Sequence, residues 1–168
     1  TLFDGKSLDG WTQVGDANWH LVKDPAGDYV QAEKGTGFLV TPKSYGNFTL
    51  KVEWWADTPA NSGVFIRAQD AKNITADNAY EFNIFDTRPD QAYRTGGIVN
   101  VAKPRRKLDS GDGKWHTYEL IVDGGGMTLK ADGTIIAEGS DYKHKAGAIA
   151  LQYSAGVVRF RRVEIQER

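Results

Sequence analysis

Two neighbouring stretches, NSGVFIRAQ and AYEFNIFD, carry residue types that could do chemistry on a sugar. Side chains alternate along a strand, so Phe65 and Arg67 are predicted to share one face, and Glu81 and Asn83 the equivalent face of the next strand. A cation, a carboxylate and an amide hold hydroxyl groups by hydrogen bonds, while a pyranose packs its C–H face on an aromatic ring. The sequence therefore predicts a sugar pocket; the alternative is a solvated face with an Arg67–Glu81 surface ion pair.

Short alternating runs separated by glycine, aspartate and asparagine recur along the chain, and no long window keeps the apolar spacing of a helix. Asp132–Gly133 predicts a hairpin, because a tight type I′ turn needs positive φ at both central positions. The pattern predicts an all-β fold, with residues 1–168 forming a single β-sandwich domain. Beside the central pair, the expected strands are Trp19–Val22, Tyr29–Ala32, Gly37–Val40, Phe48–Trp55, Gly97–Ala102, Trp115–Val122, Met127–Ala131, Thr134–Glu138, Ala148–Tyr153 and Val157–Gln166.

The composition restricts the class of partner. The formal net charge is −1 with both signs interspersed, which argues against nucleic acid or a membrane surface as a partner. No segment approaches the roughly 18 apolar residues of a membrane span. There is no cysteine, so disulfides and thiolate metal sites are excluded. A carbohydrate is the expected ligand, and nothing in the sequence indicates a protein partner.

The spacing of carboxylates and histidines does not by itself define a catalytic mechanism. A retaining glycosidase needs two carboxyl groups about 5–5.5 Å apart, but Glu81 and Asp86 are an odd number of positions apart and so point to opposite faces of a regular strand. Glu53 could face Glu81 from a neighbouring strand. His20 and His116 each follow a tryptophan, and no metal-binding motif links the histidines.

Seven motifs, in order along the chain, resemble the 3-keto-disaccharide hydrolase family. They are LFDGKSLDGW, YGNFTLKVEWW, NSGVFIR, YEFNIFD, TGGIVNVA, GKWHTYELIVDG and GAIALQYSAGVVRFRRVEI. The resemblance covers Leu2 to Ile165 and implies a concanavalin A-like jelly-roll β-sandwich of two antiparallel sheets. It also implies a bacterial protein that works outside the cytoplasm, in the periplasm, at the cell surface or in secreted form after signal removal.

The resemblance implies cleavage of glycosides whose sugar carries a ketone at C3. The ketone acidifies the proton at C2, a base removes it, the glycosidic oxygen leaves by elimination, and hydration completes the hydrolysis. By motif match, Glu81 is the acid-base residue, Arg67 the oxyanion or hydroxyl clamp, and Glu53 a second catalytic candidate. The hydroxyl ligands implied are Asn61, Asn83 and Gln152, with Trp55 as a stacking platform and Phe65 beside it. Some members look metal-dependent, so the metal is unknown and a divalent ion is left open as a cofactor.

The chain departs from the family pattern at three positions. Asn83 stands where a glutamine is usual, Val99 where a tyrosine is frequent, and Ser154 where many members carry a histidine. These changes remove a candidate base and a stacking ring from one face. Three hypotheses therefore stay open: a glycosidic-bond hydrolase, a non-catalytic lectin-like sugar-binding domain, and a structural module in which a loop or a partner covers the face with Arg67, Glu81 and Asn83.

Overall fold

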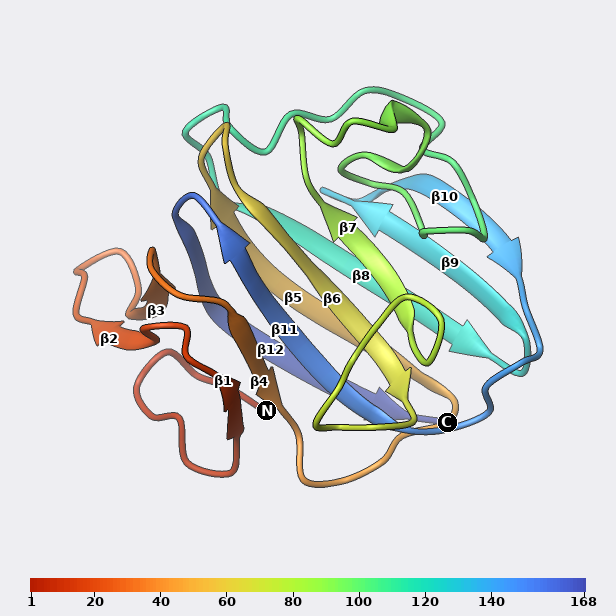
Figure 1. Cartoon of the computed structure of the whole chain (residues 1–168), viewed down its shortest axis with the longest axis horizontal. Coiled ribbons are helices and arrows are strands. Elements are labelled where there is room, and N and C mark those ends of the chain that lie inside the picture. Colours follow the sequence, from red (N-terminus) through yellow and green to blue (C-terminus); the bar gives the residue numbers. More distant parts are fainter.

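The chain forms two antiparallel sheets packed face to face (Figure 1), and the computed structural model describes residues 1–168. The prediction of an all-β sandwich is confirmed. A three-residue 3₁₀ turn, Gln91–Tyr93, is the one helical element, and no helix is long and apolar enough to cross a membrane. The five-stranded sheet runs β1 (Thr12–Gly15), β4 (Gly37–Val40), β11 (Ala148–Ala155), β6 (Asn61–Ala68) and β7 (Tyr80–Ile84). The seven-stranded sheet runs β10 (Thr134–Ser140), β9 (Gly126–Ala131), β8 (His116–Asp123), β5 (Phe48–Ala56), β12 (Val158–Glu167), β3 (Tyr29–Ala32) and β2 (His20–Val22).

The main core lies between the two sheets and is built by alternate residues of each strand. Leu50, Val52 and Trp54 of β5 are fully buried there, facing Val64 and Phe82 from the other sheet. Each such side chain contributes about 1.5–3 kcal/mol when it leaves water. Alternation therefore leaves every second side chain of the five-stranded sheet on an outer face, where a binding site can form.

Two stretches differ from the sequence-based expectation. Thr12–Gly15 forms the edge strand β1 beside β4, although this short, mostly exposed run carries little apolar alternation. The expected strand Gly97–Ala102 is wrong. Ile98 makes only isolated bridges, one of them to Ala102, because the chain folds back on itself around Asn100 at φ +62°. The segment therefore lies along β7 as an irregular border.

The hairpin prediction is confirmed, and a second backbone feature was not foreseen. Asp132 and Gly133 both have positive φ, +51° and +87°, between β9 and β10. In β6 the pairing with β11 shifts between Phe65 and Ala68, so two residues of β6 stand opposite one of β11. Arg67 in this bulge has φ +52°. A bulge redirects side chains, and here it takes Arg67 off the face that strict alternation would assign to it.

His116, at the start of β8, is held between two carboxylates. Its Nδ1 lies 2.6 Å from Asp132 Oδ2, its Nε2 lies 2.9 Å from Asp112 Oδ1, and its ring stacks on Trp54 with centroids 4.8 Å apart. A carboxylate only accepts, so both ring nitrogens donate, which requires the protonated ring. Burial alone would lower the pKa of His116, but the two carboxylates outweigh burial and raise it above its ordinary value.

We expect the free energy of unfolding to fall as the pH rises above about 6.5, the ordinary histidine value. The pKa of His116 is higher in the folded state, so its stabilisation is complete below the unfolded pKa and is lost as the pH rises through the folded pKa. Urea unfolding at about pH 6 and about pH 9 measures the difference. His116→Gln should lose this part of the pH dependence; a variant that keeps all of it would assign the effect to another group.

Candidate active site

Most of the predicted site residues gather on the outer face of the five-stranded sheet. Asn61 and Phe65 come from β6, Glu81 and Asn83 from β7, and Gln152 from β11, and the register sets Phe65 directly opposite Glu81. We call this surface the Glu81 face. Figure 1 shows these three strands side by side in the front sheet, with the loops that follow β7 at their upper end. These five residues therefore share one face of the sheet, spread over three adjacent strands.

Glu81 is the group on this face with the clearest chemical signature. Its side chain is partly buried and makes no hydrogen bond or ion pair. Burial raises the pKa of Glu81 to about 7, against the opposing charge of Arg88, which acts to lower it. Arg88 itself is held by Asp90, whose backbone oxygen accepts from Nη1 at 2.9 Å. A carboxylate whose pKa is near neutrality is suited to remove a proton at physiological pH.

An unpaired acceptor lies on the same face. The Oε1 atom of Gln152 is buried and has no hydrogen-bond partner. Its neighbour in register is Gly63, where an added Cβ would stand 3.6 Å from Oε1 and 3.5 Å from the ring of Phe65. A buried unsatisfied carbonyl costs about 1–3 kcal/mol, and a ligand hydroxyl would relieve that cost. The partly exposed amide of Asn61, on the same strand as Gly63, is also without a partner.

Two side chains of the Glu81 face are buried in contacts with the rest of the protein. Asn83 is 1% exposed; its Nδ2 donates to Tyr93 O at 2.8 Å and its Oδ1 accepts from Ile84 N at 3.0 Å. The prediction that Asn83 is free to bind a hydroxyl is therefore wrong. Phe65 is 2% exposed, packs edge-on against Phe38, and belongs to one buried cluster with Ile74 of the β6–β7 loop. Both side chains shape the face rather than open onto it.

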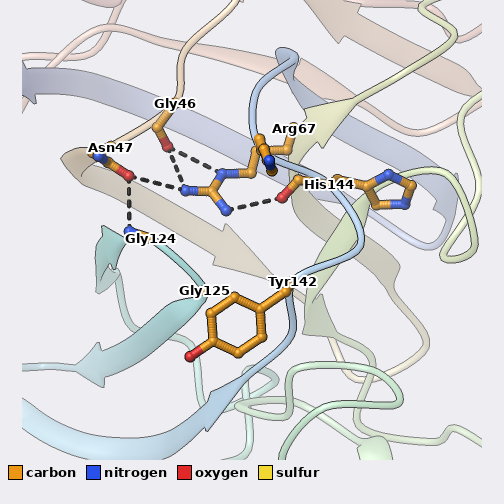
Figure 2. A pocket seen from close by; sticks show the side chains of 8 residues that line it. Gly46, Asn47, Arg67, Gly124, Gly125, Tyr142 and His144 are labelled. Carbon is orange, nitrogen blue, oxygen red and sulfur yellow. Dashed lines mark hydrogen bonds between the residues drawn. The ribbon is translucent and has the colours of Figure 1, made fainter.

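Arg67 does not lie on the Glu81 face. Its guanidinium, 2% exposed, donates from Nε and Nη2 to Gly46 O at 3.1 and 2.8 Å, from Nη2 to Asn47 Oδ1 at 3.2 Å and from Nη1 to His144 O at 3.0 Å (Figure 2). The predicted clamp beside Glu81 is wrong, because the β6 bulge shifts the alternation at this residue. The guanidinium instead joins the entry of β5 to the connection before β11.

Glu53 and Trp55 lie on the far side of the sandwich. Both project from the outer face of the seven-stranded sheet, where Arg161 Nε donates to Glu53 Oε2 at 2.6 Å and Arg159 stands over the Trp55 ring at 4.2 Å. The predictions that Glu53 faces Glu81 and that Trp55 is a platform beside it are wrong. Strand β5 pairs with β8 and β12, and a sequence pattern does not reveal to which sheet a strand belongs.

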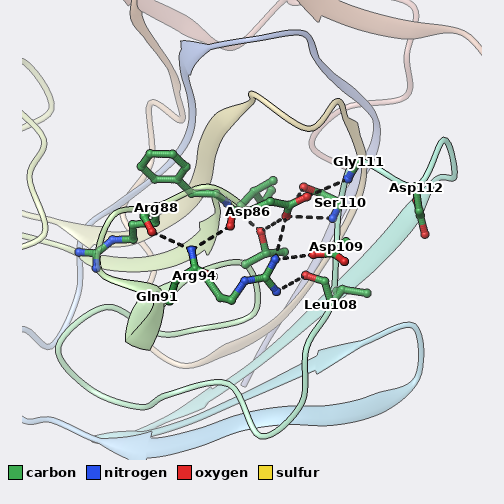
Figure 3. A network of polar contacts seen from close by, with 12 residues as sticks. Asp86, Arg88, Gln91, Arg94, Leu108, Asp109, Ser110, Gly111 and Asp112 are labelled. Atoms are coloured by element: carbon green, nitrogen blue, oxygen red, sulfur yellow. Dashed lines mark hydrogen bonds and ion pairs between the residues drawn. The ribbon is translucent and has the colours of Figure 1, made fainter.

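A buried polar network, which the sequence pattern did not indicate, holds the loops around the site (Figure 3). Asp86 Oδ1 accepts from Thr95 Oγ1 at 2.5 Å and from Ser110 N and Oγ at 3.0 and 2.8 Å, while Oδ2 accepts from Gly111 N at 3.0 Å. Arg94 Nη2 lies 3.8 Å from Asp86 Oδ1. Asp86 is thus a loop anchor, and the segment that it fixes borders β7.

The structure offers no ready metal centre at the Glu81 face. No group of three or more histidine, cysteine, aspartate or glutamate side chains is placed to hold a metal ion. The residues that lie opposite Glu81 across the sheet are neutral: Phe65 on β6 and, beyond it, Ala150 on β11. The residues present therefore do not fit a metal, and the chemistry of the site is derived from its carboxylate and amides.

Solved structures with this jelly roll include enzymes and sugar-binding modules. The chain aligns with a candidate glycosyl hydrolase of Parabacteroides distasonis at 20% identity and a TM-score of 0.84, over 99% of this chain and 92% of the other. A Bacillus subtilis carbohydrate-binding module aligns at 17% identity and 0.67, over 94% and 96%. A family 16 endo-glucanase of Bacteroides ovatus aligns at 13% identity and 0.73, over 97% and 98%. Such low identities show the fold alone.

Sequence comparison gives the family. A 3-keto-disaccharide hydrolase of Bacteroides thetaiotaomicron is 30% identical over 86 residues, which are 46% of this chain and 30% of the relative, so the match spans less than a third of the relative's length. Residues 1–166 match the model of the 3-keto-alpha-glucoside-1,2-lyase-like domain. That match takes in the strands that carry Asn61, Glu81 and Gln152. The chain belongs to the 3-keto-alpha-glucoside-1,2-lyase-like domain family, as its motifs predicted.

Proposed function

We propose that the protein cleaves the glycosidic bond of 3-keto-glycosides on the Glu81 face, with Glu81 as the base. The observation that carries the proposal is a partner-free carboxylate with a pKa of about 7 on an outer sheet face. The same sheet face carries an unpaired amide carbonyl, Gln152 Oε1, on β11, with β6 between it and the strand of Glu81. Polar groups of this kind fix the orientation of a bound ligand. Family membership and the hydrolase named among its relatives support the same reaction class.

The chemistry follows from the ketone of the substrate. Glu81 takes the C2 proton, the C2 electron pair is delocalised into the C3 carbonyl, and the C1–O bond breaks as the enolate collapses, releasing the aglycone alcohol after its oxygen gains a proton. Addition of water across the resulting C1–C2 double bond gives free 3-keto-sugar. A base whose pKa lies near the working pH gives the best compromise between the fraction ionised and the driving force for proton transfer.

A sugar-binding domain without turnover is the second candidate, and a specific observation favours it. Ser154, where many family members carry a histidine, lies on β11 between Tyr153 and Ala155, where the pairing with β6 shifts register. Val99, where a tyrosine is frequent, donates its backbone N–H to Glu81 O at 2.9 Å. The substitution at position 99 therefore falls next to the backbone of the proposed base, and the one at position 154 removes a histidine from β11. A carbohydrate-binding module with this fold shows that the sandwich also serves binding alone.

Incubation with 3-keto-glucosides separates the two candidates. We expect release of 3-keto-glucose, a rate that rises through about pH 7 as Glu81 ionises and then levels off, and no release from the matched glucoside that lacks the ketone. Product is followed by chromatography and affinity by calorimetry. Binding without release at any pH would assign the protein to the lectin-like class. Equal release from both substrates would show that the ketone plays no part.

A further inference from the structure

A second candidate site is the hollow beside Arg67. Here the structure holds a positive charge without a counterion. Arg67 is 2% exposed, yet its bonds go to two backbone carbonyls and one amide oxygen, and no carboxylate pairs with it. Burial lowers the pKa of this guanidinium below its ordinary value, which reflects the same uncompensated charge. A buried cation without an anion is costly, and an incoming anion would relieve that cost.

The protein's own hydrogen bonds leave part of Arg67 unused. A guanidinium has five N–H groups, and the four bonds to Gly46, Asn47 and His144 leave one N–H on Nη1. A purely structural role for Arg67, joining the ends of two strands, explains its four hydrogen bonds. That role does not explain the fifth N–H group or the hollow of about 300 Å³ that Arg67 lines. That volume is at the lower end of ligand pockets, which run from about 300 Å³ upward.

The rest of the lining suits a small organic anion. Figure 2 shows the Arg67 guanidinium on one side and the Tyr142 ring on the other, with Gly124 and Gly125 beside them. Tyr142 is 76% exposed, and its ring lies so close to Gly125 that an added Cβ there would meet Cε1 at 2.3 Å. Lys145 also lines the hollow, makes no ion pair, and no carboxylate lines it.

We propose that this hollow binds the carboxylate of a sugar acid of the uronate type, with the sugar ring against Tyr142. One carboxylate oxygen accepts from the free N–H of Arg67 and the other from the Lys145 ammonium, so both cationic side chains of the lining are engaged. A phosphate has more oxygens than these two donors can satisfy and no carbon body for the aromatic ring. A neutral sugar would leave the buried charge uncompensated. The hollow is separate from the Glu81 face, so this inference does not depend on the proposed hydrolysis.

Titration of ¹⁵N-labelled protein with sodium glucuronate tests the proposal at constant ionic strength. Saturable shifts are expected at Gly124, Gly125 and Tyr142 amides, with a Kd that is roughly millimolar for so few polar contacts. Glucose, the neutral counterpart, should give no saturable shift there, and inorganic phosphate should bind at least about tenfold more weakly. The Glu81→Gln variant should bind glucuronate as the wild type does.

Variants at exposed positions keep the test independent of folding, since Arg67 substitutions disturb the sheet junction. Tyr142→Ala and Lys145→Ala should each weaken glucuronate binding by about fivefold to tenfold, whereas Tyr142→Phe, which keeps the ring, should bind normally. Equal binding of glucose, tighter binding of phosphate, or unchanged affinity in both alanine variants would each overturn the proposal. Absence of saturable shifts would leave Arg67 as a structural clamp only.

Discussion

The Glu81→Gln variant is expected to lose about 10²–10⁴-fold in kcat on 3-keto-glucosides while its KM changes little. Gln has nearly the same shape as Glu, and the Glu81 side chain has no protein partner to lose, so the substitution removes the base and little else. Steady-state kinetics at about pH 8, where the wild-type carboxylate is ionised, measure the loss. Unchanged turnover would remove Glu81 from the mechanism.

The same variant should be more stable than the wild type at alkaline pH. The pKa of Glu81 is raised from its ordinary 4.5 to about 7 in the folded protein, so the folded state keeps a proton that the unfolded state has lost. Stability therefore falls as the pH rises between these values, and Gln removes that fall, a gain on the order of 2 kcal/mol after allowance for solvent screening. A variant that loses activity and gains stability would indicate that the Glu81 carboxylate serves function although its ionised form destabilises the fold.

Glu53→Gln is the matched control for this prediction. Glu53 is also a glutamate on an outer sheet face, but its partner is Arg161 and it lies on the opposite side of the sandwich from Glu81. Its kcat should stay within about twofold of wild type, since a surface ion pair contributes at most about 1 kcal/mol. A large loss of activity in Glu53→Gln would mean that the active face has been assigned to the wrong sheet.

Alternation of side chains predicted most of the Glu81 face because β6 and β7 pair without a register shift around Glu81 and Asn83. The same rule failed at Arg67, since one extra residue in β6 shifts all later side chains, and no residue type in NSGVFIR signals the bulge. Glycine is the residue that usually adopts positive φ, so a glycine at position 67 would have indicated a bulge. Arg67 adopts φ +52° without any such indication in the sequence.

Glu53 and Trp55 illustrate a second kind of failure. Their strand was predicted correctly, but the sheet to which β5 belongs depends on pairing with β12, more than a hundred positions away. Asn83 illustrates a third kind. Its face was predicted correctly, yet the loop that covers it comes from the irregular segment around Tyr93, whose course no periodicity predicts. Local patterns determine faces, whereas pairing and loop closure determine which faces meet and which stay open.

The Asp86→Ala variant is expected to lose about 3–5 kcal/mol of stability, which corresponds to a fall of roughly 10 °C in Tm for a chain of this size. Asp86 is 8% exposed and accepts four hydrogen bonds, one from Thr95 and three from residues 110 and 111, which link the segment after β7 to that loop. Its removal leaves Thr95, Ser110 and Gly111 donors unsatisfied and takes away the nearby negative charge from Arg94. Differential scanning calorimetry measures the change.

Asp109→Ala is the control, because Asp109 also pairs with Arg94, at 2.5 Å, but its side chain is 55% exposed. Its loss should therefore cost less than about 1 kcal/mol of stability.

Removal of the Asp86 side chain should also change the environment of Glu81. Gly97 O accepts from Asn83 N and Val99 N donates to Glu81 O, so loosening this border exposes Glu81. Since burial is what raises the pKa of Glu81, the pH at which turnover rises should move below about 7 in Asp86→Ala. A variant that is destabilised but keeps the wild-type pH profile would show that the network supports the fold without tuning the base.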